Sequence, residues 1–347
     1  MKNIIKVLLV VMALVLVITA FTACEPTEEP CTHEGYEAYR AAVNPTCTET
    51  GLTVGSYCTK CGEDILPQEV APALGHDYSV DVSVAATCTE AGYSEMKCSR
   101  CDATNGKTVI DALGHKVGED GVCTGCKNVL VTTADELVAA LEAGKNVVLM
   151  NDIIIDPANM SNAYGTTGLN IKNGQSLDGN GFVLDIHGAS GTWDSGVNTT
   201  GGVIKNIKIT GAFRGVFINH NSDHSEQVVL ENVVIEGTTY TISCDQGKEQ
   251  TFKAVGSTFN GWTSYAATLG SAEFVDCKFG EGNGYAYCRP YAETTFTNCV
   301  FEEGYEIDAT RTTLTFVNCY VGETLVTAEN VVELLGDGAA SIVFENN

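Results

Sequence analysis

Cysteine pairs at C-x-x-C spacing recur in the first third of the chain, and histidines are interleaved with them. The pairs are Cys58/Cys61, Cys98/Cys101 and Cys123/Cys126. Two thiolates at this spacing lie on one tight turn and can bind a single ion, and zinc prefers four such ligands in a tetrahedron. The region from residue 31 to 127 is therefore predicted to form small metal-binding modules.

Two repeated phrases indicate which ligands belong together. Thr46-Cys47-Thr48-Glu49 recurs as Thr87-Cys88-Thr89-Glu90, and Ala73-Leu74-Gly75-His76 recurs as Ala112-Leu113-Gly114-His115. If each unit begins with its histidine, only Cys31 is left without a set. If the histidine instead follows its cysteines, both His33 and the Cys123/Cys126 pair are left without one. The predicted ligand sets are His33, Cys47, Cys58 and Cys61; His76, Cys88, Cys98 and Cys101; and a truncated third set of His115, Cys123 and Cys126, which is either weaker or completed by Cys31 or a carboxylate.

Disulfides are the alternative, because units of about 40 residues bury too little core to be stable unaided. The nine cysteines from 31 to 126 are an odd number, and a disulfide scheme leaves the interleaved histidines without a role. Full occupancy by protein ligands favours structural zinc over catalytic zinc, which keeps one position open for water. These units resemble the Cys/His-rich repeats of bacterial surface proteins, and that resemblance implies a spacer role.

The N-terminus has the features of a secretory signal. Lys2 and Lys6 precede an apolar run from Val7 to Phe21, which is short for a membrane span. The end of the segment, residues 21–24, resembles a lipoprotein lipobox with Phe21 in place of the usual leucine, which implies lipidation at Cys24. The expected order is thus a signal peptide at 1–23, an acidic tether at 24–30 and an extracytoplasmic, membrane-anchored remainder at the cell surface; a plain secreted protein is the alternative.

The charge balance excludes nucleic acid as a partner. The chain has a net charge of −25, whereas phosphate backbones are bound by clustered lysine and arginine. Acidic polysaccharides would also be repelled unless a cation such as calcium bridged the two.

From residue 204 to 321 a phrase of the form apolar-x-Asn/Asp-apolar-x-apolar occurs six times, with copies 20 to 26 residues apart. A fixed period of this length indicates stacked rungs, because one rung cannot bury its own apolar face. The copies are Ile204–Ile209, Leu230–Ile235, Ala254–Phe259, Phe274–Phe279, Phe296–Phe301 and Phe316–Val321. The third position is expected at a sharp bend with its amides in a ladder. The fourth and sixth should point inward, so Cys277, Cys299 and Cys319 are expected to be buried, inert thiols.

A capping box at Thr133–Glu136 and Gly144 predict a short helix ahead of an apolar run from Val147 to Ile155. This order, together with Leu177-Asp178-Gly179-Asn180-Gly181, resembles the opening of the pectate-lyase-like superfamily. The resemblance implies an all-β fold at 130–347, a right-handed parallel β-helix whose N-terminal helix covers the end of the sheet stack.

A further strand is expected after each phrase, at 215–219, 240–245, 265–269, 285–289 and 305–309, and alternation places one set of its side chains outside. In enzymes of the resembled fold this face carries the substrate groove. The predicted ligand-binding residues are Phe217, Asn219, Ser243, Asp245, Thr268, Tyr287, Arg289 and Asp308. An ordinary solvated sheet face would show the same alternation. His220 and His224 could bind metal, although a pair in a polar loop is usually just solvated.

Two functions remain open, with a third tied to the modules. The favoured one is a lipid-anchored surface protein whose zinc-stabilised spacers carry a β-helix that binds a polysaccharide or a cell-surface protein. The alternative is a polysaccharide lyase or glycoside hydrolase, with Tyr287 and Arg289, or Asp245 and Asp308, as catalytic candidates. The catalytic phrases of that superfamily are absent from the sequence, which weighs against activity. Zinc acquisition by the modules would require labile sites.

Overall fold

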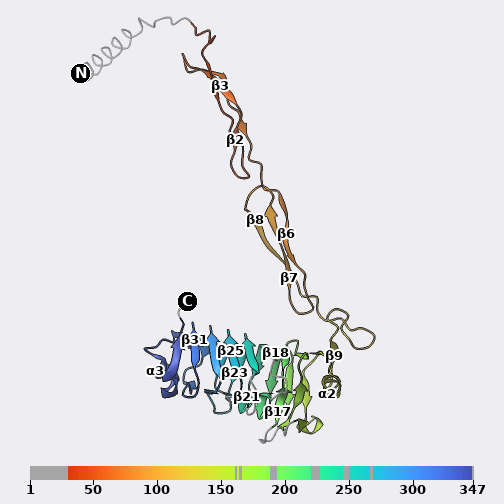
Figure 1. Ribbon diagram of the computed structural model, residues 1–347. Helices are drawn as coiled ribbons and strands as arrows, with labels where there is room; N and C mark the ends of the chain where they lie inside the picture. Colours follow the sequence, from red (N-terminus) through yellow and green to blue (C-terminus); the bar gives the residue numbers. More distant parts are fainter. Residues whose placement is uncertain are drawn as a thin grey trace, which may run out of the picture. The chain divides into compact units, whose positions relative to one another are not determined.

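The computed structural model describes residues 30–160, 162–163, 166–187, 194–219, 227–244, 250–265 and 269–345. The chain divides into two compact units, the first formed by residues up to 85 with 92–110, and the second by 86–91 with 111–347 (Figure 1). The predicted signal peptide, lipidated Cys24 and most of the tether lie outside the described residues, as do Asp245, Thr268, His220 and His224. Within the described residues no helix is long and apolar enough to cross a membrane.

The first unit consists of small antiparallel sheets. One contains β1 (Glu37–Arg40), β3 (Gly55–Cys58) and β4 (Asp64–Leu66), with β2 (Gly51–Leu52) paired to β5 (Val70–Ala71), and the other contains β6 (Tyr78–Val84), β7 (Gly92–Cys98) and β8 (Thr104–Ile110). Apolar side chains such as Val80 and Val109 are 61% and 65% exposed. These sheets have almost no apolar core, and small units of this kind usually depend on disulfides or metal ions for their stability.

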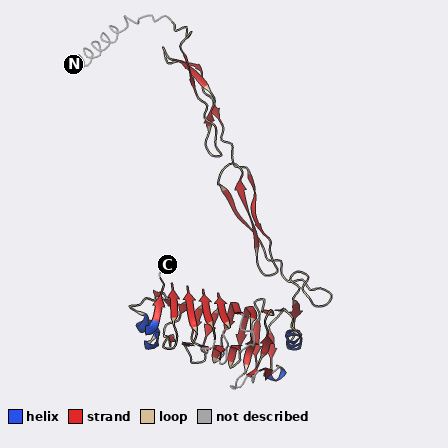
Figure 2. Ribbon diagram, in the orientation of Figure 1, coloured by secondary structure: helices blue, strands red, loops and turns tan. Residues whose placement is uncertain are grey.

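The second unit is a parallel β-helix with three faces (Figure 2), as the repeat predicted. Face 1 contains β9 (Val129–Val131), β10 (Val147–Leu149), β15 (Ser176–Asp178), the first halves of β18 (Gly202–Thr210) and β20 (Gln227–Ile235), β22 (Thr251–Val255), β25 (Ser271–Val275), β28 (Glu293–Thr297), β31 (Leu314–Val317) and β34 (Ile342–Phe344). Face 2 contains β11 (Ile153–Ile155), β16 (Val183–Ile186), the second halves of β18 and β20, β23 (Thr258–Asn260), β26 (Lys278–Gly280), β29 (Val300–Phe301), β32 (Tyr320–Val321) and the antiparallel β33 (Thr324–Leu325). Face 3 contains β14 (Leu169–Ile171), β17 (Ser195–Thr199), β19 (Arg214–Ile218), β21 (Tyr240–Cys244), β24 (Trp262–Tyr265), β27 (Tyr287–Pro290) and β30 (Glu306–Ile307). A separate two-stranded pair, β12 (Asn162–Ala163) and β13 (Thr166–Thr167), precedes β14.

The bend between faces 1 and 2 depends on the third residue of each repeated phrase. Asn206, Asn232, Asp276, Asn298 and Asn318 have φ between 49° and 54°, a left-handed conformation that asparagine and aspartate tolerate better than other non-glycine residues. Their side chains form the expected ladder: Nδ2 of Asn232 donates to Oδ1 of Asn206 at 3.1 Å, and Nδ2 of Asn318 donates to Oδ1 of Asn298 at 2.9 Å. The ladder is broken at Gly256, which has φ 58° and no side chain to continue it.

The core of the β-helix contains the fourth and sixth residues of the phrases, as expected. Cys277, Cys299 and Cys319 are buried, and the thiol of Cys277 donates to the carbonyl of Val275 at 3.3 Å. Phenylalanines stack from turn to turn: the rings of Phe274 and Phe296 lie 5.0 Å apart, nearly parallel at 8°. Burial raises the pKa of Cys299 well above its usual range, so this thiol is an inert apolar filler.

Helices cover both ends of the β-helix (Figure 1). At the N-terminal end, α2 (Ala134–Glu142) begins with the predicted capping box of Thr133 and Glu136 and buries Leu137 and Leu141. At the C-terminal end lie α3 (Val331–Leu335) and the 3-10 helix η2 (Asp337–Ser341), neither of which was expected from the residue pattern. A further 3-10 helix, η1 (Pro157–Asn159), follows β11. Covering these ends limits pairing with other sheets.

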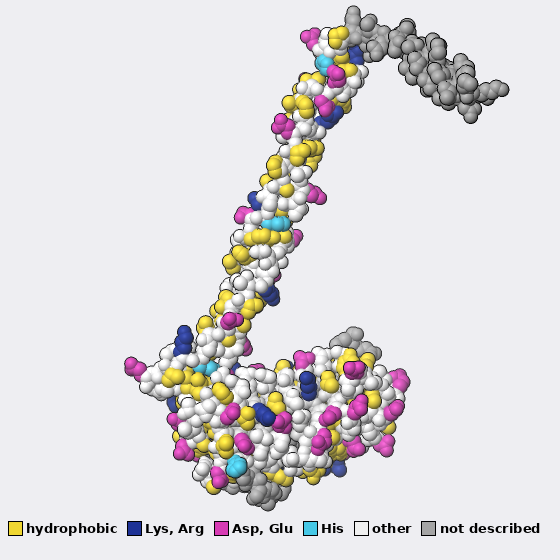
Figure 3. Space-filling view, turned by 180° about the vertical axis from the view of Figure 1, so that it is seen from behind, with side chains coloured by type: hydrophobic (Ala, Val, Ile, Leu, Met, Phe, Trp, Pro, Cys, Tyr) yellow, Lys and Arg dark blue, Asp and Glu magenta, His cyan; other side chains and the backbone are white. Residues whose placement is uncertain are grey.

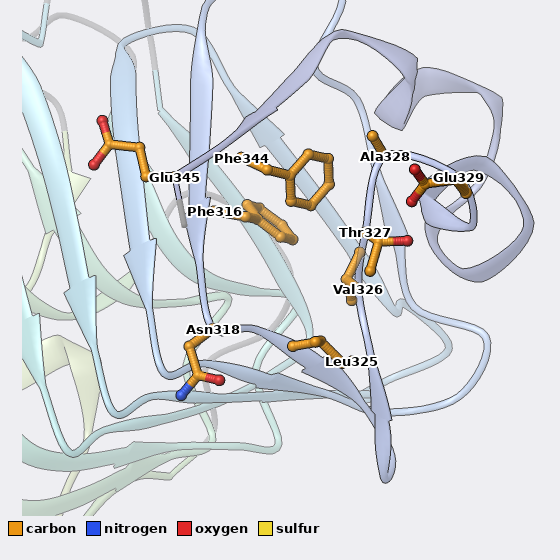
Figure 4. Close-up of a pocket in the computed structure, with 9 residues that line it drawn as sticks. All are labelled: Phe316, Asn318, Leu325, Val326, Thr327, Ala328, Glu329, Phe344 and Glu345. Atoms are coloured by element: carbon orange, nitrogen blue, oxygen red, sulfur yellow. The ribbon is translucent and has the colours of Figure 1, made fainter. Parts of the chain in front are cut away.

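A cavity of about 520 Å³ lies beside the C-terminal helices (Figure 4). Its lining consists of Phe316, Asn318, Leu325, Val326, Thr327, Ala328, Glu329, Phe344 and Glu345. The only ionisable groups in this lining are two carboxylates, and none of the predicted site residues contributes to it.

One predicted strand on face 3 was out of position. The strand begins at Trp262, directly after Gly261, rather than at Tyr265. Tyr265 consequently points into the core, where its hydroxyl lies 2.6 Å from Oγ1 of Thr294. Alignment of the strands on their tyrosines caused the error, because the turn at Gly261 is shorter than the turns in neighbouring rungs.

Filling the gap in the ladder tests the role of the bends. Gly256→Asn should raise the free energy of unfolding by about 1 kcal/mol, because the new amide can bond to Asn232 and the flexible glycine is removed from the unfolded state. No atom lies within 4 Å of a Cβ placed at this glycine, so the side chain fits. Thermal and urea unfolding measure the change. Gly256→Ala is the matched control and should be less stable than Gly256→Asn, because it retains the left-handed strain without the hydrogen bond; equal stability of the two variants would contradict the ladder.

Candidate metal centres and recognition face

Three clusters of side chains have the composition of metal sites. Each contains three thiols and one imidazole whose ligand atoms all lie within 4.8 Å of one another. Cluster 1 is Cys31, His33, Cys58 and Cys61; cluster 2 is Cys47, His76, Cys98 and Cys101; cluster 3 is Cys88, His115, Cys123 and Cys126. Clusters 1 and 2 lie within the first unit and cluster 3 within the second.

The spacing of the ligand atoms fits a tetrahedral ion. The Sγ–Sγ distances are 3.7 Å for Cys31–Cys58, 3.7 Å for Cys47–Cys98 and 3.8 Å for Cys88–Cys123, and Sγ–Nδ1 is 3.3 Å for Cys101–His76 and 3.5 Å for Cys126–His115. Zinc–sulfur bonds of about 2.3 Å in a tetrahedron place two sulfurs about 3.8 Å apart. The cysteines of the described region are free thiols, and the clusters can therefore hold a metal ion.

The structure keeps nine of the eleven predicted ligands in their predicted sets and moves Cys47 and Cys88. Each histidine does lie with the predicted C-x-x-C pair, but Cys47 belongs to cluster 2 and Cys88 to cluster 3. Cys31, which had been left over, completes cluster 1, so the third set is not truncated. The error arises because an extended strand rises about 3.3 Å per residue, which carries Cys47 to the end of its hairpin opposite Cys58.

Backbone hydrogen bonds between the two repeated phrases explain the grouping of ligands in the structure. The N–H of Gly75 donates to the carbonyl of Cys47 at 3.1 Å, and the N–H of Gly114 donates to the carbonyl of Cys88 at 3.0 Å. The histidine that follows each glycine is thereby placed beside that cysteine. The C-x-x-C pair of the next unit supplies the other two ligands, so the ion would join two successive units.

Local geometry prepares Cys98 for ligation. The N–H groups of Arg100 and Asp77 each lie 3.4 Å from Sγ of Cys98. Both hydrogen bonds, chiefly the one from the N–H of Arg100, lower the pKa of Cys98 to about 5. The thiolate is the form of cysteine that binds metal.

In cluster 1 the imidazole of His33 is oriented by a carboxylate. Its Nε2 lies 3.3 Å from Oε2 of Glu63, while its Nδ1 is buried without a hydrogen-bond partner among the described residues. A carboxylate on the outer nitrogen is the usual support of a metal-bound histidine. Glu63 was missed from the sequence, although it lies two residues after the C-x-x-C pair.

Face 3 brings together part of the predicted ligand-binding set. The strand register places Phe217, Ser243 and Arg289 in one outward column. Asp308 lies beside them, since its N–H donates to the carbonyl of Cys288 at 2.9 Å. Phe217, Asn219 and Ser243 are nevertheless buried, at 5%, 3% and 2% exposure, so the accessible part of the set in the described region is Tyr287, Arg289 and Asp308. Their role in binding stays a prediction.

An aromatic ladder on the same face was missed from the sequence. The rings of Tyr240 and Trp262 stack at 4.7 Å, and those of Trp262 and Tyr285 stack at 5.4 Å. Tyr287 meets Trp262 edge-on at 5.7 Å. A strand expected at 265–269 does not include Trp262; the glycine before this tryptophan is the signal that locates the true start of the strand. Such flat aromatic surfaces are suited to ligands with apolar faces.

Two guanidinium groups extend this ladder. Arg289 lies over Trp262 at 5.0 Å and over Tyr291 at 5.6 Å, and Arg311 lies over Tyr291 at 4.8 Å. Nε1 of Trp262 and Nε of Arg289 are buried without a hydrogen-bond partner among the described residues. The platform of face 3, defined here as Tyr240, Trp262, Tyr285, Tyr287, Arg289, Tyr291 and Arg311, therefore combines stacked aromatic rings with guanidinium groups.

The pKa values of Tyr287 and Asp308 are shifted in opposite directions. Burial and the neighbouring Asp308 carboxylate raise the pKa of Tyr287. The pKa of Asp308 is lowered, chiefly by the hydroxyl of Thr310. A phenol that is harder to ionise is a poorer general base near neutral pH, and a carboxylate that is harder to protonate is a poorer general acid.

Comparison with known proteins agrees with the β-helix. The family model of the pectate lyase-like adhesive domain matches residues 128–233, which extend from β9 into β20. This is less than half of the chain. No curated protein and no solved structure matches it.

The grouping of the ligands can be tested by double substitution. Cys47→Ser with Cys98→Ser should remove one bound zinc per chain, because both residues belong to one site, whereas Cys47→Ser with Cys58→Ser should remove two. Metal content after gel filtration under reducing conditions, measured by mass spectrometry, gives the stoichiometry. The reverse pattern would restore the grouping expected from the sequence.

Proposed function

We propose that this protein is a surface adhesin, anchored to the membrane through a lipidated Cys24. Its zinc-stabilised modules act as spacers, and its β-helix binds a glycan or another cell-surface partner. The platform of face 3 is the observation that carries this proposal. The adhesive-domain match over residues 128–233 supports the same conclusion.

Zinc is the metal best suited to the clusters. Three thiolates and one imidazole form a soft, tetrahedral donor set, which selects zinc over the hard cations calcium and magnesium. Because all four positions are filled by protein, the ion would stabilise structure rather than activate water. An environment outside the cytoplasm would also favour disulfides, so the ion would protect the thiols from oxidation.

A neutral glycan fits the platform better than an acidic one. Sugar rings present apolar faces that stack on tryptophan and tyrosine, while arginine supplies bidentate hydrogen bonds. Acidic side chains are spread over the visible face of the β-helix domain, with fewer basic ones among them (Figure 3). An acidic polysaccharide would therefore need calcium as a bridge.

A polysaccharide lyase or glycoside hydrolase is the second candidate. The observation in its favour is that Tyr287, Arg289 and Asp308 lie together on face 3, and its weakness is the ionisation of Tyr287 described above. Incubation with neutral and acidic polysaccharides, with and without calcium, followed by counting of new chain ends, separates the two functions. Turnover that disappears in Arg289→Ala and Asp308→Asn would replace binding by catalysis, whereas no turnover with retention on a polysaccharide favours the adhesin.

Removing the central ring of the platform should weaken binding. Trp262→Ala is expected to raise the Kd for a retained polysaccharide about tenfold, equivalent to about 1.4 kcal/mol, because Tyr240 and Tyr285 lose the ring on which they stack. Affinity electrophoresis or calorimetry with the retained polysaccharide measures the change. Tyr320→Ala is the matched control, since this tyrosine lies on β32 of face 2; if both variants bind equally well, the platform is not the site.

A further inference from the structure

Cluster 3 differs from the other two clusters in what it contacts. Cys123 is fully buried in a small apolar group with Leu130 and Val148, against which Cys88 and Met150 also pack. Leu130 and Val148 belong to β9 and β10, the first strands of face 1. Their neighbours Val131 and Val147 point into the core, so Leu130 and Val148 point outward. Val148 is nevertheless 0% exposed, because the cluster covers it.

The segment that leads into cluster 3 also occupies the free edge of the β-helix. One edge of β9 pairs with β10. At the other edge, the N–H of Leu130 donates to the carbonyl of Gly121 at 2.8 Å, and Val122 forms an antiparallel bridge with Val129. An uncovered edge of this kind is a template for pairing with another chain. Residues 118–123 thus cover this edge of the first strand.

This covering segment has few interactions of its own. It is held by isolated bridges, such as that between Val117 and Cys123, and by the bond from the N–H of Gly118 to the carbonyl of Val122 at 2.8 Å. Lone bridges without a core are marginally stable in water. Ligands of cluster 3 lie at both ends of the segment, with His115 before it, Cys123 as its last residue and Cys126 after it, so an ion would hold it closed.

Gly125 shows how tightly the side chains of cluster 3 pack against the C-x-x-C turn. A Cβ on Gly125 would lie 2.7 Å from Sγ of Cys88 and 3.9 Å from Sγ of Cys123. The corresponding position of the other C-x-x-C turns holds Lys60 and Arg100. In cluster 3 alone, the cysteine from outside the C-x-x-C pair, Cys88, therefore occupies space that a side chain on the turn would fill.

We propose that the ion of cluster 3 is the N-terminal edge cap of the β-helix. While α2 covers the end of the core, the ion holds residues 115–126 over the outer face and the free edge of β9 and β10. Clusters 1 and 2 then stabilise only the modules. The inference rests on the zinc occupancy proposed above and extends it to the β-helix: removal of this one ion would open the edge and allow chains to pair end to end.

Two single-ligand variants test the cap in the full chain. Cys126→Ser removes an exposed ligand of cluster 3, and Cys101→Ser removes the equivalent ligand of cluster 2. Both should bind one zinc fewer than the unaltered protein. Only Cys126→Ser should speed hydrogen exchange at the amide of Leu130, by about tenfold or more, and shift the protein toward larger species in light scattering. Exchange within β25 serves as the internal reference for an intact β-helix.

A third variant keeps all the ligands and changes only the space around them. Gly125→Ala should lose the zinc of cluster 3 and the protection of the Leu130 amide, whereas Lys60→Ala at the equivalent position of cluster 1 should keep both. If the unaltered protein binds no zinc, the proposed zinc occupancy fails. If zinc is lost from cluster 3 while the Leu130 amide stays protected and the protein stays monodisperse, the cap alone is overturned.

Discussion

Pairing between successive turns is the interaction on which the rest of this protein depends. Each turn of the β-helix forms its backbone hydrogen bonds and buries its apolar face only against the turns before and after it. The bend residues repeat this dependence in their side chains, since each amide of the ladder bonds to the rung before it. The stacked phenylalanines do the same within the core, where the rings of Phe279 and Phe301 lie 4.8 Å apart. Stability therefore propagates along the stack and is weakest at its two ends.

The modules lack this source of stability, because their small sheets have no neighbouring turns against which to bury apolar side chains. Their sheets expose large apolar side chains, including Tyr39 at 73% and Val70 at 65%. A metal ion would replace the missing core in such small modules, since its binding free energy becomes folding free energy. Cluster 2 draws its ligands from two successive modules, so one ion there would stabilise both.

Face 3 shows how a stacked architecture forms a binding surface. The turn-to-turn register places Arg214, Tyr240, Trp262 and Tyr287 in one column, so aromatic side chains that are 22 to 25 residues apart in sequence from Tyr240 to Tyr287 become neighbours. The guanidinium of Arg289, from the neighbouring column, lies over Trp262. Rigid rings on a rigid sheet lose little conformational freedom on binding, which favours recognition. On the same face the pKa of Tyr287 is raised and that of Asp308 is lowered, which makes the phenol a poorer base and the carboxylic acid a poorer acid near neutral pH.

The sequence by itself determined the features that depend on local spacing. The period of the repeated phrase predicts the β-helix, the inward thiols and the bends at asparagine, and Thr133 with Glu136 predicts the start of α2, because each of these arises within a few residues of chain. Only the tertiary structure decided which cysteine completes each cluster, that Trp262 rather than Tyr265 faces outward, and that Phe217 and Ser243 are buried. These outcomes depend on how far a strand carries a residue and on turn lengths between rungs. Distances of this kind are set by segments that meet through space, and the spacing of residues along the chain does not record them.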